Sequence, residues 1–264
     1  MNILEEIAAR TKERIETQKK VLPLSEIMET ASSMDITGDF PFEKALKSED
    51  ISFICEIKKA SPSKGIIAEK FPYIDIAREY ELSGASSISV LTEPYYFLGN
   101  SQYLREIAGA VSIPLLRKDF TVDSYMIYEA KILGASAVLL ICALLDRKTL
   151  AGFIDIANSL GISALVETHN EEEIDMALDS GARIIGVNNR NLKTFEVDIT
   201  LSERLRKRVP SDILFVSESG INSPGDILRL REIKADAVLI GENIMRSTDK
   251  KAAINRLRGL YDKS

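Results

Sequence analysis

The chain has 264 residues, of which 45% are hydrophobic and 28% charged, a composition typical of a globular protein rather than a disordered one. Its formal net charge is −6, so it lacks the basic excess expected of a general nucleic-acid binder. Two cysteines, Cys55 and Cys142, are too few for a disulfide framework or a cysteine-rich zinc site. We therefore expect buried thiols and a reducing, cytoplasmic compartment.

The first part of the chain predicts a helical extension. Apolar residues at helical spacing predict a helix from Asn2 to about Lys20, Pro23 ends that pattern, and a weaker helix is expected over residues 24–34. Gly38 and Pro41 then indicate a turn. The acidic start has no apolar segment of a signal peptide, and the longest apolar run is too short to span a bilayer. We expect residues 1–48 to pack on residues 49–264 as one domain overall.

From residue 53 onward, short apolar runs alternate with longer amphipathic stretches of helical spacing. The runs are Phe53–Lys58, Ser86–Leu91, Ile113–Lys118, Ala137–Cys142, Ile162–Glu167, Arg183–Asn188, Ile213–Glu218 and Ala237–Gly241. Helical patterns follow them, for example over residues 74–82, 124–133, 147–160, 171–179 and 224–233. Eight strands that alternate with helices predict a parallel (β/α)8 barrel, a TIM barrel of the α/β class.

A recurring motif also favours closure into a barrel. Every second strand follows a Gly-Ala pair, or a Lys-Ala pair in the last case. The four pairs begin at Gly84, Gly134, Gly181 and Lys234. A step of about fifty residues, or two βα units, is what a barrel built from quarter-turns shows. The alternatives are that Gly-Ala is only a common helix ending, and that the sheet is open and doubly wound.

Polar side chains gather at the predicted carboxyl ends of the strands. Residues two apart in a strand share a face. We therefore expect the last polar residue of such a run to point into the barrel together with the residue two positions before it. The inward polar set is Glu56, Lys58, Lys118, Glu167, Asn188 and Glu218. Charges aimed into a barrel are costly unless they pair or function, and barrel active sites lie at this end. A single residue of this kind is more often a solvated rim residue, but six favour a site.

The composition of this set predicts acid–base chemistry without a metal. Two lysines and three glutamates held together must perturb each other's pKa values, so that lysines donate protons and a withdrawn carboxylate holds one. The strand-seven and strand-eight loops contain Gly220 and Gly241, and a short helix after Gly241 would favour an anion. The segment 61–65 offers a hydroxyl and a mobile lid.

Other catalytic motifs are missing from the sequence. It contains no GxxxxGK[ST], GxGxxG or HExxH motif, and its one histidine, His169, is interpreted as a loop or helix-start residue. We expect neither a metal nor a cofactor.

Several stretches together resemble the indole-3-glycerol phosphate synthase family over nearly the whole chain, up to about Arg246. They are EIKKASPSKG at 56–65, LRKDF at 116–120, GVNNRNL at 186–192, SESGI at 217–221 and IGENIM at 240–245. The resemblance implies a TIM barrel with a helical N-terminal extension. It also implies an enzyme, a carboxy-lyase of tryptophan biosynthesis. That family converts 1-(2-carboxyphenylamino)-1-deoxyribulose 5-phosphate into indole-3-glycerol phosphate, CO2 and water.

The resemblance further implies roles for individual residues. Lys118 matches the general acid on the substrate carbonyl, Glu167 matches the glutamate of the dehydration proton transfers, and Lys58 matches a substrate-binding lysine that donates a proton in that step. The supporting polar network is Glu56, Asn188 and Glu218. The phosphate-binding set is Ser61, Ser219, Gly220, Gly241 and Glu242. The aromatic-ring pocket is Phe97, Phe120, Leu139, Leu192 and Leu239, and Arg190 meets the substrate carboxylate.

One position departs from some family members, which have serine where this chain has Glu242. A carboxylate repels a phosphate, so we expect the backbone to bind the phosphate while this side chain turns away.

Three other functions stay open on the sequence alone: a Schiff-base aldolase, an enzyme like phosphoribosylanthranilate isomerase, and an inactive phosphate-ligand-binding barrel. As partners we expect a small sugar phosphate, no nucleic acid and no membrane, and we keep other tryptophan-pathway enzymes as candidates.

Overall fold

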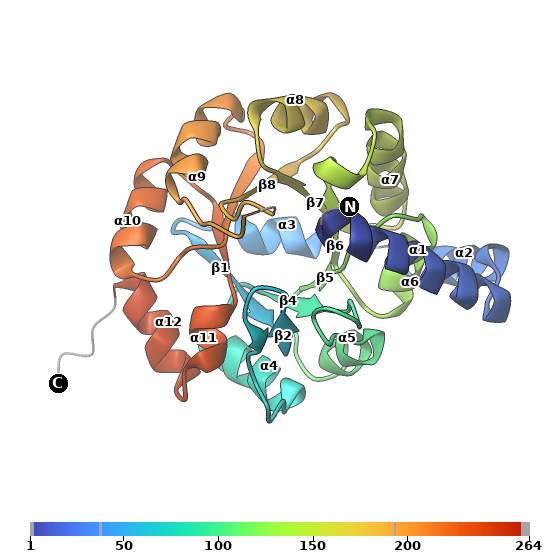
Figure 1. Cartoon of the computed structure of the whole chain (residues 1–264), viewed down its shortest axis with the longest axis horizontal. Coiled ribbons are helices and arrows are strands. Elements are labelled where there is room, and N and C mark those ends of the chain that lie inside the picture. Colours follow the sequence, from blue (N-terminus) through green and yellow to red (C-terminus); the bar gives the residue numbers. More distant parts are fainter. Residues whose placement is uncertain (1–2, 37–38, 193, 260–264) are drawn as a thin grey trace.

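The eight predicted apolar runs form the eight strands of a closed barrel. The computed structural model describes residues 3–36, 39–192 and 194–259. The strands are β1 (Ser52–Ile57), β4 (Ser87–Leu91), β5 (Leu115–Lys118), β6 (Ala137–Ile141), β7 (Ser163–Thr168), β8 (Ile184–Asn188), β9 (Leu214–Glu218) and β10 (Ala237–Ile240). They pair in parallel in the order β1-β10-β9-β8-β7-β6-β5-β4, and β4 returns to β1 (Figure 1). The barrel prediction is confirmed, and the open doubly wound sheet is wrong.

Helices surround the barrel and alternate with its strands (Figure 1). They are α4 (Tyr73–Leu82), α5 (Ser101–Ala108), α6 (Tyr125–Ile132), α7 (Arg147–Ser159), α8 (Glu171–Asp179), α9 (Thr200–Leu205), α10 (Pro224–Glu232), α11 (Glu242–Arg246) and α12 (Lys250–Arg258), with short 3-10 turns η1 (Cys142–Leu144) and η2 (Arg206–Arg208). The recurring motif begins, in all four copies, with a residue of positive φ that ends a helix: Gly84, Gly134, Gly181 and Lys234. The motif is therefore the end of a helix, and it recurs because the barrel repeats the same strand–helix unit.

The N-terminal segment forms three helices, α1 (Ile3–Val21), α2 (Leu24–Ser33) and α3 (Pro41–Leu46). The first two match the predicted helices, whereas α3 replaces part of what we expected to be a turn. Of that turn, Gly38 lies outside the described residues, as does the predicted helix start at Asn2. Six residues are too few to show helical periodicity, so α3 left little signal in the sequence.

The first and third helices occupy opposite ends of the barrel. Helix α3 buries Phe42 and Leu46 against inward-facing strand residues such as Ile54 and Leu214. Its Glu43 accepts hydrogen bonds from Arg183 and Ser163, which stand where strands begin, so α3 closes the amino-terminal floor. Helix α1 starts near the centre of the ring and runs outward to α2 at its edge, and α2 packs against α6 (Figure 1).

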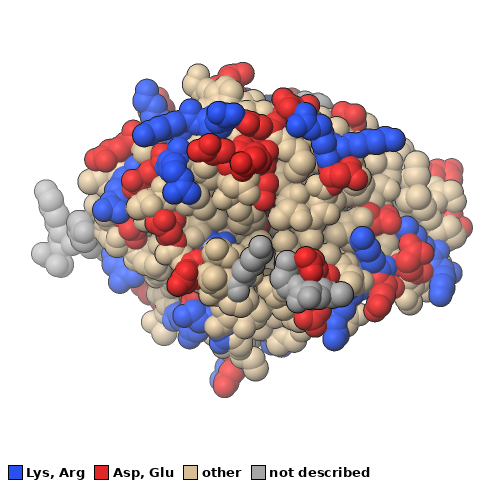
Figure 2. Space-filling model, turned by 45° about the horizontal axis from the view of Figure 1, so that its top comes forward, with Lys and Arg blue, Asp and Glu red and all other residues tan. Residues whose placement is uncertain are grey.

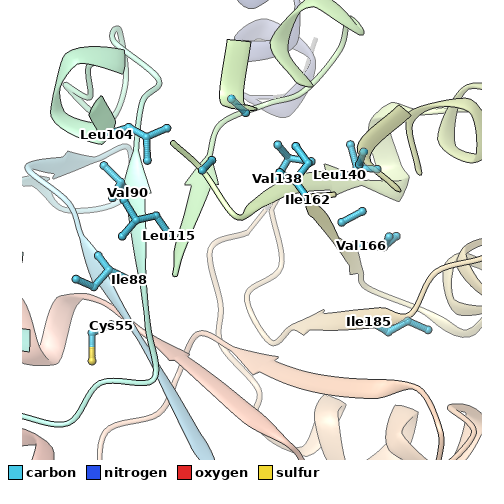
Figure 3. Packing of buried hydrophobic residues seen from close by; sticks show 14 of the residues in the cluster. Cys55, Ile88, Val90, Leu104, Leu115, Val138, Leu140, Ile162, Val166 and Ile185 are labelled. Atoms are coloured by element: carbon cyan, nitrogen blue, oxygen red, sulfur yellow. The ribbon is translucent and has the colours of Figure 1, made fainter. Parts of the chain in front are cut away.

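Strand residues alternate between two apolar layers, as the spacing predicted. Phe53, Cys55 and Ile57 belong to the layer between strands and helices, whereas Ile54 belongs to the barrel interior. Figure 3 shows the outer layer, in which strand residues such as Val90 and Leu115 lie near Leu104 of helix α5. This alternation fixes which side chains point inward.

A small hairpin follows the first strand. Strands β2 (Ala60–Ser61) and β3 (Gly65–Ile66) pair antiparallel, and Ala60 N donates to Phe97 O in the next loop. Both cysteines are free and buried, as predicted. Within the described part of the chain, no helix combines the length and the apolar character needed to cross a membrane.

Candidate active site

The carboxyl ends of the strands surround a cavity of about 690 Å³. Every residue of the inward polar set lines it: Glu56, Lys58, Lys118, Glu167, Asn188 and Glu218. So does every residue of the substrate-binding set: Ser61, Phe97, Phe120, Leu139, Arg190, Leu192, Ser219, Gly220, Leu239, Gly241 and Glu242. Side chains that lie far apart in the sequence thus meet in one space, because the strands that carry them are parallel and in register.

Lys118, the last residue of β5, lies between two carboxylates. Its Nζ is 3.3 Å from Glu167 Oε2 on β7 and 3.5 Å from Glu218 Oε2 on β9. Burial alone would lower the pKa of Lys118, but the carboxylates of Glu167, Glu218 and Glu56 outweigh it and raise that pKa. The lysine is therefore a cation, with a proton available for an oxygen placed against it.

The pKa values of the two carboxylates beside Lys118 are shifted in opposite directions. Burial raises the pKa of Glu167, but Lys118, His169 and a hydrogen bond with Asn188 outweigh it and hold the pKa below its usual range. Burial, reinforced by Glu167 and Glu56, raises the pKa of Glu218 to about 7 in spite of Lys118. Two acids that differ in this way can serve as a base and as a proton holder at neutral pH.

A missing side chain makes room for Glu218. Gly186 on β8 points inward beside it, and a Cβ at this position would collide with Glu218 Oε1. That oxygen is buried and has no hydrogen-bond partner. An unpartnered carboxylate oxygen in a buried place favours the protonated acid, in agreement with the raised pKa.

A second lysine–glutamate pair lies on β1 and just after it. Lys58 Nζ donates to Glu56 Oε1, and both side chains are largely buried. Gly241 stands opposite, where a Cβ would come within 2.5 Å of Glu56 Oε1 and 3.1 Å of Lys58 Nζ. The glycine predicted for anion binding thus also leaves space for this pair.

The residues of the predicted phosphate site line the cavity on the loops after β1, β9 and β10. Ser219 and Gly220 both have positive φ, +67° and +82°, so the β9 loop turns its backbone sharply. Helix α11 begins directly after Gly241, where a short helix was predicted. Glu242 Oε1 accepts from Arg246 Nε at 3.2 Å and is 3.9 Å from Lys64 Nζ. The carboxylate of Glu242 therefore interacts with the positively charged side chains of Arg246 and Lys64.

Apolar side chains also line the cavity. The rings of Phe97 and Phe120 lie with centroids 6.0 Å apart, and Leu139, Leu192 and Leu239 line the cavity from β6, from the loop after β8 and from β10. Arg190 Nη1 donates to Phe195 O at 3.1 Å, which holds the β8 loop in shape. The cavity thus combines apolar side chains with cationic and anionic groups.

Sequence reasoning missed the contribution of α1 to the cavity. Ile3, Leu4 and Ile7 line it, and Arg14 Nη2 binds Asp119 Oδ2 at 2.9 Å, next to Lys118. Thr92 Oγ1 also donates to Asp119. The helical spacing of Leu4 and Ile7 predicted a buried face, but periodicity does not say what that face packs against.

His169 also lies closer to the site than expected. It precedes α8, as interpreted from the sequence, but its Nε2 is 3.4 Å from Glu167 Oε1. The sequence places it two residues after Glu167, which by strand parity puts it on the same side.

Comparisons with known proteins agree with this geometry. The family model described as indole-3-glycerol phosphate synthase matches residues 4–257. The indole-3-glycerol phosphate synthase of Ruminiclostridium cellulolyticum is 60% identical over 257 residues, which cover 97% of this chain and 99% of that protein. The enzyme of the same name from Lachnoclostridium phytofermentans is 49% identical over 98% of this chain and 99% of its own length.

Solved structures support the fold alone. A mutant tryptophan synthase α-subunit from Pyrococcus furiosus superimposes with a TM-score of 0.61 at 16% identity, covering 80% of this chain and 98% of that one. A 3-hexulose-6-phosphate synthase gives a TM-score of 0.64 at 15% identity, covering 80% of this chain and 99% of its own.

Proposed function

The chain belongs to the indole-3-glycerol phosphate synthase family, and from this membership we propose how the residues around Lys118 carry out the family's reaction. The chain is a carboxy-lyase of tryptophan biosynthesis. It closes and decarboxylates 1-(2-carboxyphenylamino)-1-deoxyribulose 5-phosphate and then removes water, which yields indole-3-glycerol phosphate. The observation that carries the residue assignment is Lys118 held as a cation between Glu167 and Glu218, in a cavity that apolar side chains also line.

Ring closure requires a proton at the ketone oxygen and an aromatic carbon held against the ketone carbon. In our proposal Lys118 donates that proton, while Phe97 and Phe120 hold the substrate ring in place. Fixed geometry can supply a large part of the rate gain of such a step. The carboxylate is then lost as CO2, because the cationic ring intermediate accepts the electron pair. This step needs no cofactor.

Dehydration requires an acid for the departing hydroxyl and a base for the ring proton. Lys58 is the proposed acid, and Glu167, whose pKa is held below its usual range, is the proposed base. Glu56 orients Lys58 through their ion pair, and Asn188 orients Glu167 through a hydrogen bond. Glu218 completes the polar network around Lys118.

The two anionic groups of the substrate are assigned to different residues in this proposal. We assign the phosphate to Ser61, Ser219, Gly220 and Gly241, with Glu242 turned toward Arg246. We assign the substrate carboxylate to Arg190. The proposed partner is this small sugar phosphate, and association with other tryptophan-pathway enzymes stays a prediction. A cytoplasmic location is also proposed, since both cysteines are free and buried.

Exchange of Lys118 tests this mechanism. Lys118→Met should lower turnover by at least about a hundredfold, because it removes the acid of ring closure. The dissociation constant of the substrate should change little, since the phosphate and ring contacts remain. Turnover is followed by indole fluorescence, and binding by titration of the variant. Lys148→Met, which removes an exposed lysine from α7, is the matched control. Equal losses in binding and rate would reduce Lys118 to an anchor.

The site also argues against a Schiff-base aldolase. Such an enzyme needs a neutral lysine as nucleophile, whereas the surrounding carboxylates raise the pKa of Lys118. Treatment with borohydride in the presence of substrate should therefore leave no covalent adduct on Lys118 or Lys58. An adduct found by mass spectrometry would support the aldolase instead.

A further inference from the structure

Asn189, the residue after β8, has a buried side chain whose amide is fully hydrogen-bonded. Strand parity places this side chain on the opposite face from Asn188, which lines the main cavity. Asn189 Nδ2 donates to Ser217 Oγ and to Ser219 O, both at 3.0 Å. Asn189 Oδ1 accepts from Ser202 N at 3.1 Å and from Ser202 Oγ at 2.8 Å. The amide therefore uses both of its donors and both of its acceptor sites.

These contacts allow only one orientation of the amide. Ser202 N can only donate and Ser219 O can only accept, so exchanging the amide oxygen and nitrogen of Asn189 would break both bonds. Ser202 Oγ lies 2.8 Å from Ser217 Oγ, which closes a ring of hydrogen bonds through three buried side chains. Hydrogen bonds in such a network polarise and strengthen one another. The ring thus holds the amide in place and leaves one N–H for Ser219.

The backbone of Ser219 has a conformation that benefits from such a partner. Its φ of +67° lies in the left-handed region, which a residue with a Cβ rarely occupies. Gly220 follows with a φ of +82°, and a Cβ there would come within 2.4 Å of Val197 Cγ1. Both Ser219 and Gly220 line the main cavity. The hydrogen bond from Asn189 therefore acts on the first residue of the turn to which the proposed function assigns the phosphate.

The backbone of Asn189 joins the loops after β8 and β9 as well. Asn189 N donates to Glu218 O at 2.9 Å, and Asp198 N, near the far end of the β8 loop, donates to Asn189 O at 2.9 Å. The next residue in the chain is Arg190, to which the proposed function assigns the substrate carboxylate. Asn189 thus connects the segments proposed for both anionic groups of the substrate.

We propose that Asn189 is a positioning residue for the substrate phosphate, because it fixes the backbone of Ser219 in the left-handed conformation that shapes the β9 turn. This inference rests on the proposed function. Asn189 acts through Ser219 and makes no contact of its own with the substrate. The phosphate takes no part in the bonds that form and break, so holding it stabilises the bound substrate and the transition state alike. Loss of Asn189 should therefore raise KM and leave kcat nearly unchanged.

Two unreactive ligands measure how much the phosphate contributes to binding. One is the alcohol obtained by reducing the ketone of the substrate, and the other is the same alcohol without its phosphate. The dissociation constant of the second divided by that of the first is the phosphate ratio of a protein. A variant that is only less stable binds both ligands less well by the same factor, so its phosphate ratio stays that of the parent. Titration calorimetry gives both dissociation constants, by displacement where binding is weak.

Exchange of Asn189 should lower the phosphate ratio. In Asn189→Ala the ratio should fall roughly fivefold to tenfold, because the hydrogen bond that holds Ser219 is lost. KM should rise by a similar factor, with kcat within about twofold of the parent value. Ser202→Ala is the matched control, since it removes a hydroxyl from the same ring but leaves Asn189 bonded to Ser202 N and to Ser219 O. Its phosphate ratio should stay within about twofold of that of the parent.

A second variant covers the case in which Asn189→Ala does not fold. Asn189→Asp keeps an acceptor for Ser202 N but has no N–H for Ser219 O, and its phosphate ratio should fall at low and at high salt. Repulsion by the added charge weakens as salt is added, whereas the lost hydrogen bond does not return. A parental phosphate ratio in folded Asn189→Ala, or in Asn189→Asp at high salt, would overturn the proposal. An equal fall in Ser202→Ala would also overturn it.

The parent protein tests the proposed function separately. If the parent makes no product, or binds both alcohols equally well, the reaction or the phosphate assignment fails before Asn189 is considered. If the parent makes product and prefers the phosphorylated alcohol, but the Asn189 variants keep the same phosphate ratio, only the role of Asn189 fails.

Discussion

Among single residues, Glu218 has the most unusual chemistry. It is 2% exposed, its carboxylate has an unpartnered oxygen, and Gly186 leaves it just enough room. A pKa of about 7 in the folded protein compares with 4.5 for an unperturbed glutamate. The proton on Glu218 therefore stabilises the fold fully below pH 4.5, and this contribution is lost as the pH rises toward 7.

Exchange of Glu218 by its neutral analogue should remove this pH dependence. Glu218→Gln should unfold at a higher temperature than the parent at pH 8 and at nearly the same temperature at pH 5. The difference at pH 8 is at most about 3 kcal/mol in the free energy of unfolding. Differential scanning calorimetry at pH 8 and at pH 5 measures the unfolding temperatures of both proteins. A variant that is less stable at pH 8 would mean that the attraction between Glu218 and Lys118 outweighs burial.

Among the elements, the hairpin after β1 and helix α11 meet at the predicted phosphate site. Lys64 of the hairpin and Arg246 of α11 both approach Glu242, which lines the cavity with them. The side chain of Glu242 is 32% exposed, so solvent screens part of its charge. Its carboxylate contacts two cations that, in the proposed binding mode, would otherwise be available to the substrate phosphate.

Neutralising this carboxylate should strengthen substrate binding. Glu242→Gln removes a negative charge near the phosphate and frees Lys64 and Arg246, so KM should fall about fivefold at low ionic strength. The effect should shrink as salt is added, with kcat little changed. Glu232→Gln on α10 makes the same charge change at an exposed position away from the cavity and should have no effect. A higher KM in Glu242→Gln would show that the carboxylate helps by holding Lys64 in place.

The elements also differ in how well the sequence predicts them. Strands of the barrel were visible because both of their faces are buried, which leaves continuous apolar runs. Strand β5 begins two residues later than predicted, since Pro114 has no N–H to donate. Helix α3 and the β2–β3 hairpin were missed because contacts distant in the sequence hold them, as between Glu43 and Arg183. The convergence of Lys118 with Glu167 followed from strand parity, but the contribution of α1 to the cavity did not, because periodicity does not say what a helix face packs against.

At the scale of the whole molecule, both ends of the barrel are covered by the N-terminal segment. Leu4 of α1 lies at the mouth, and Phe42 of α3 is fully buried at the floor. Basic and acidic side chains are interspersed on the face seen in Figure 2 and do not gather into a patch of one sign. The charged residues of the proposed site line the cavity instead.

Removing the ring that closes the floor should cost stability but not chemistry. Phe42→Ala should lower the free energy of unfolding by about 3–5 kcal/mol, because it leaves a buried void. For a chain of this size the melting temperature should fall by roughly 10 °C. Activity at 25 °C should persist, since the floor lies opposite the site. Leu228→Ala, which truncates an exposed leucine, is the control. A loss of activity in folded Phe42→Ala would show that the two ends are coupled.

The path of α1 has a practical consequence for anyone who attaches a tag or a second domain. An addition ahead of Ile3 emerges beside the opening through which ligands enter, because Ile3 itself lines the cavity. Helix α12 ends on the other side, where Arg258 hydrogen-bonds the Gly84 carbonyl just before β4 begins. A fusion partner joined after α12 therefore leaves the opening free, and that terminus is the better choice for immobilisation or labelling.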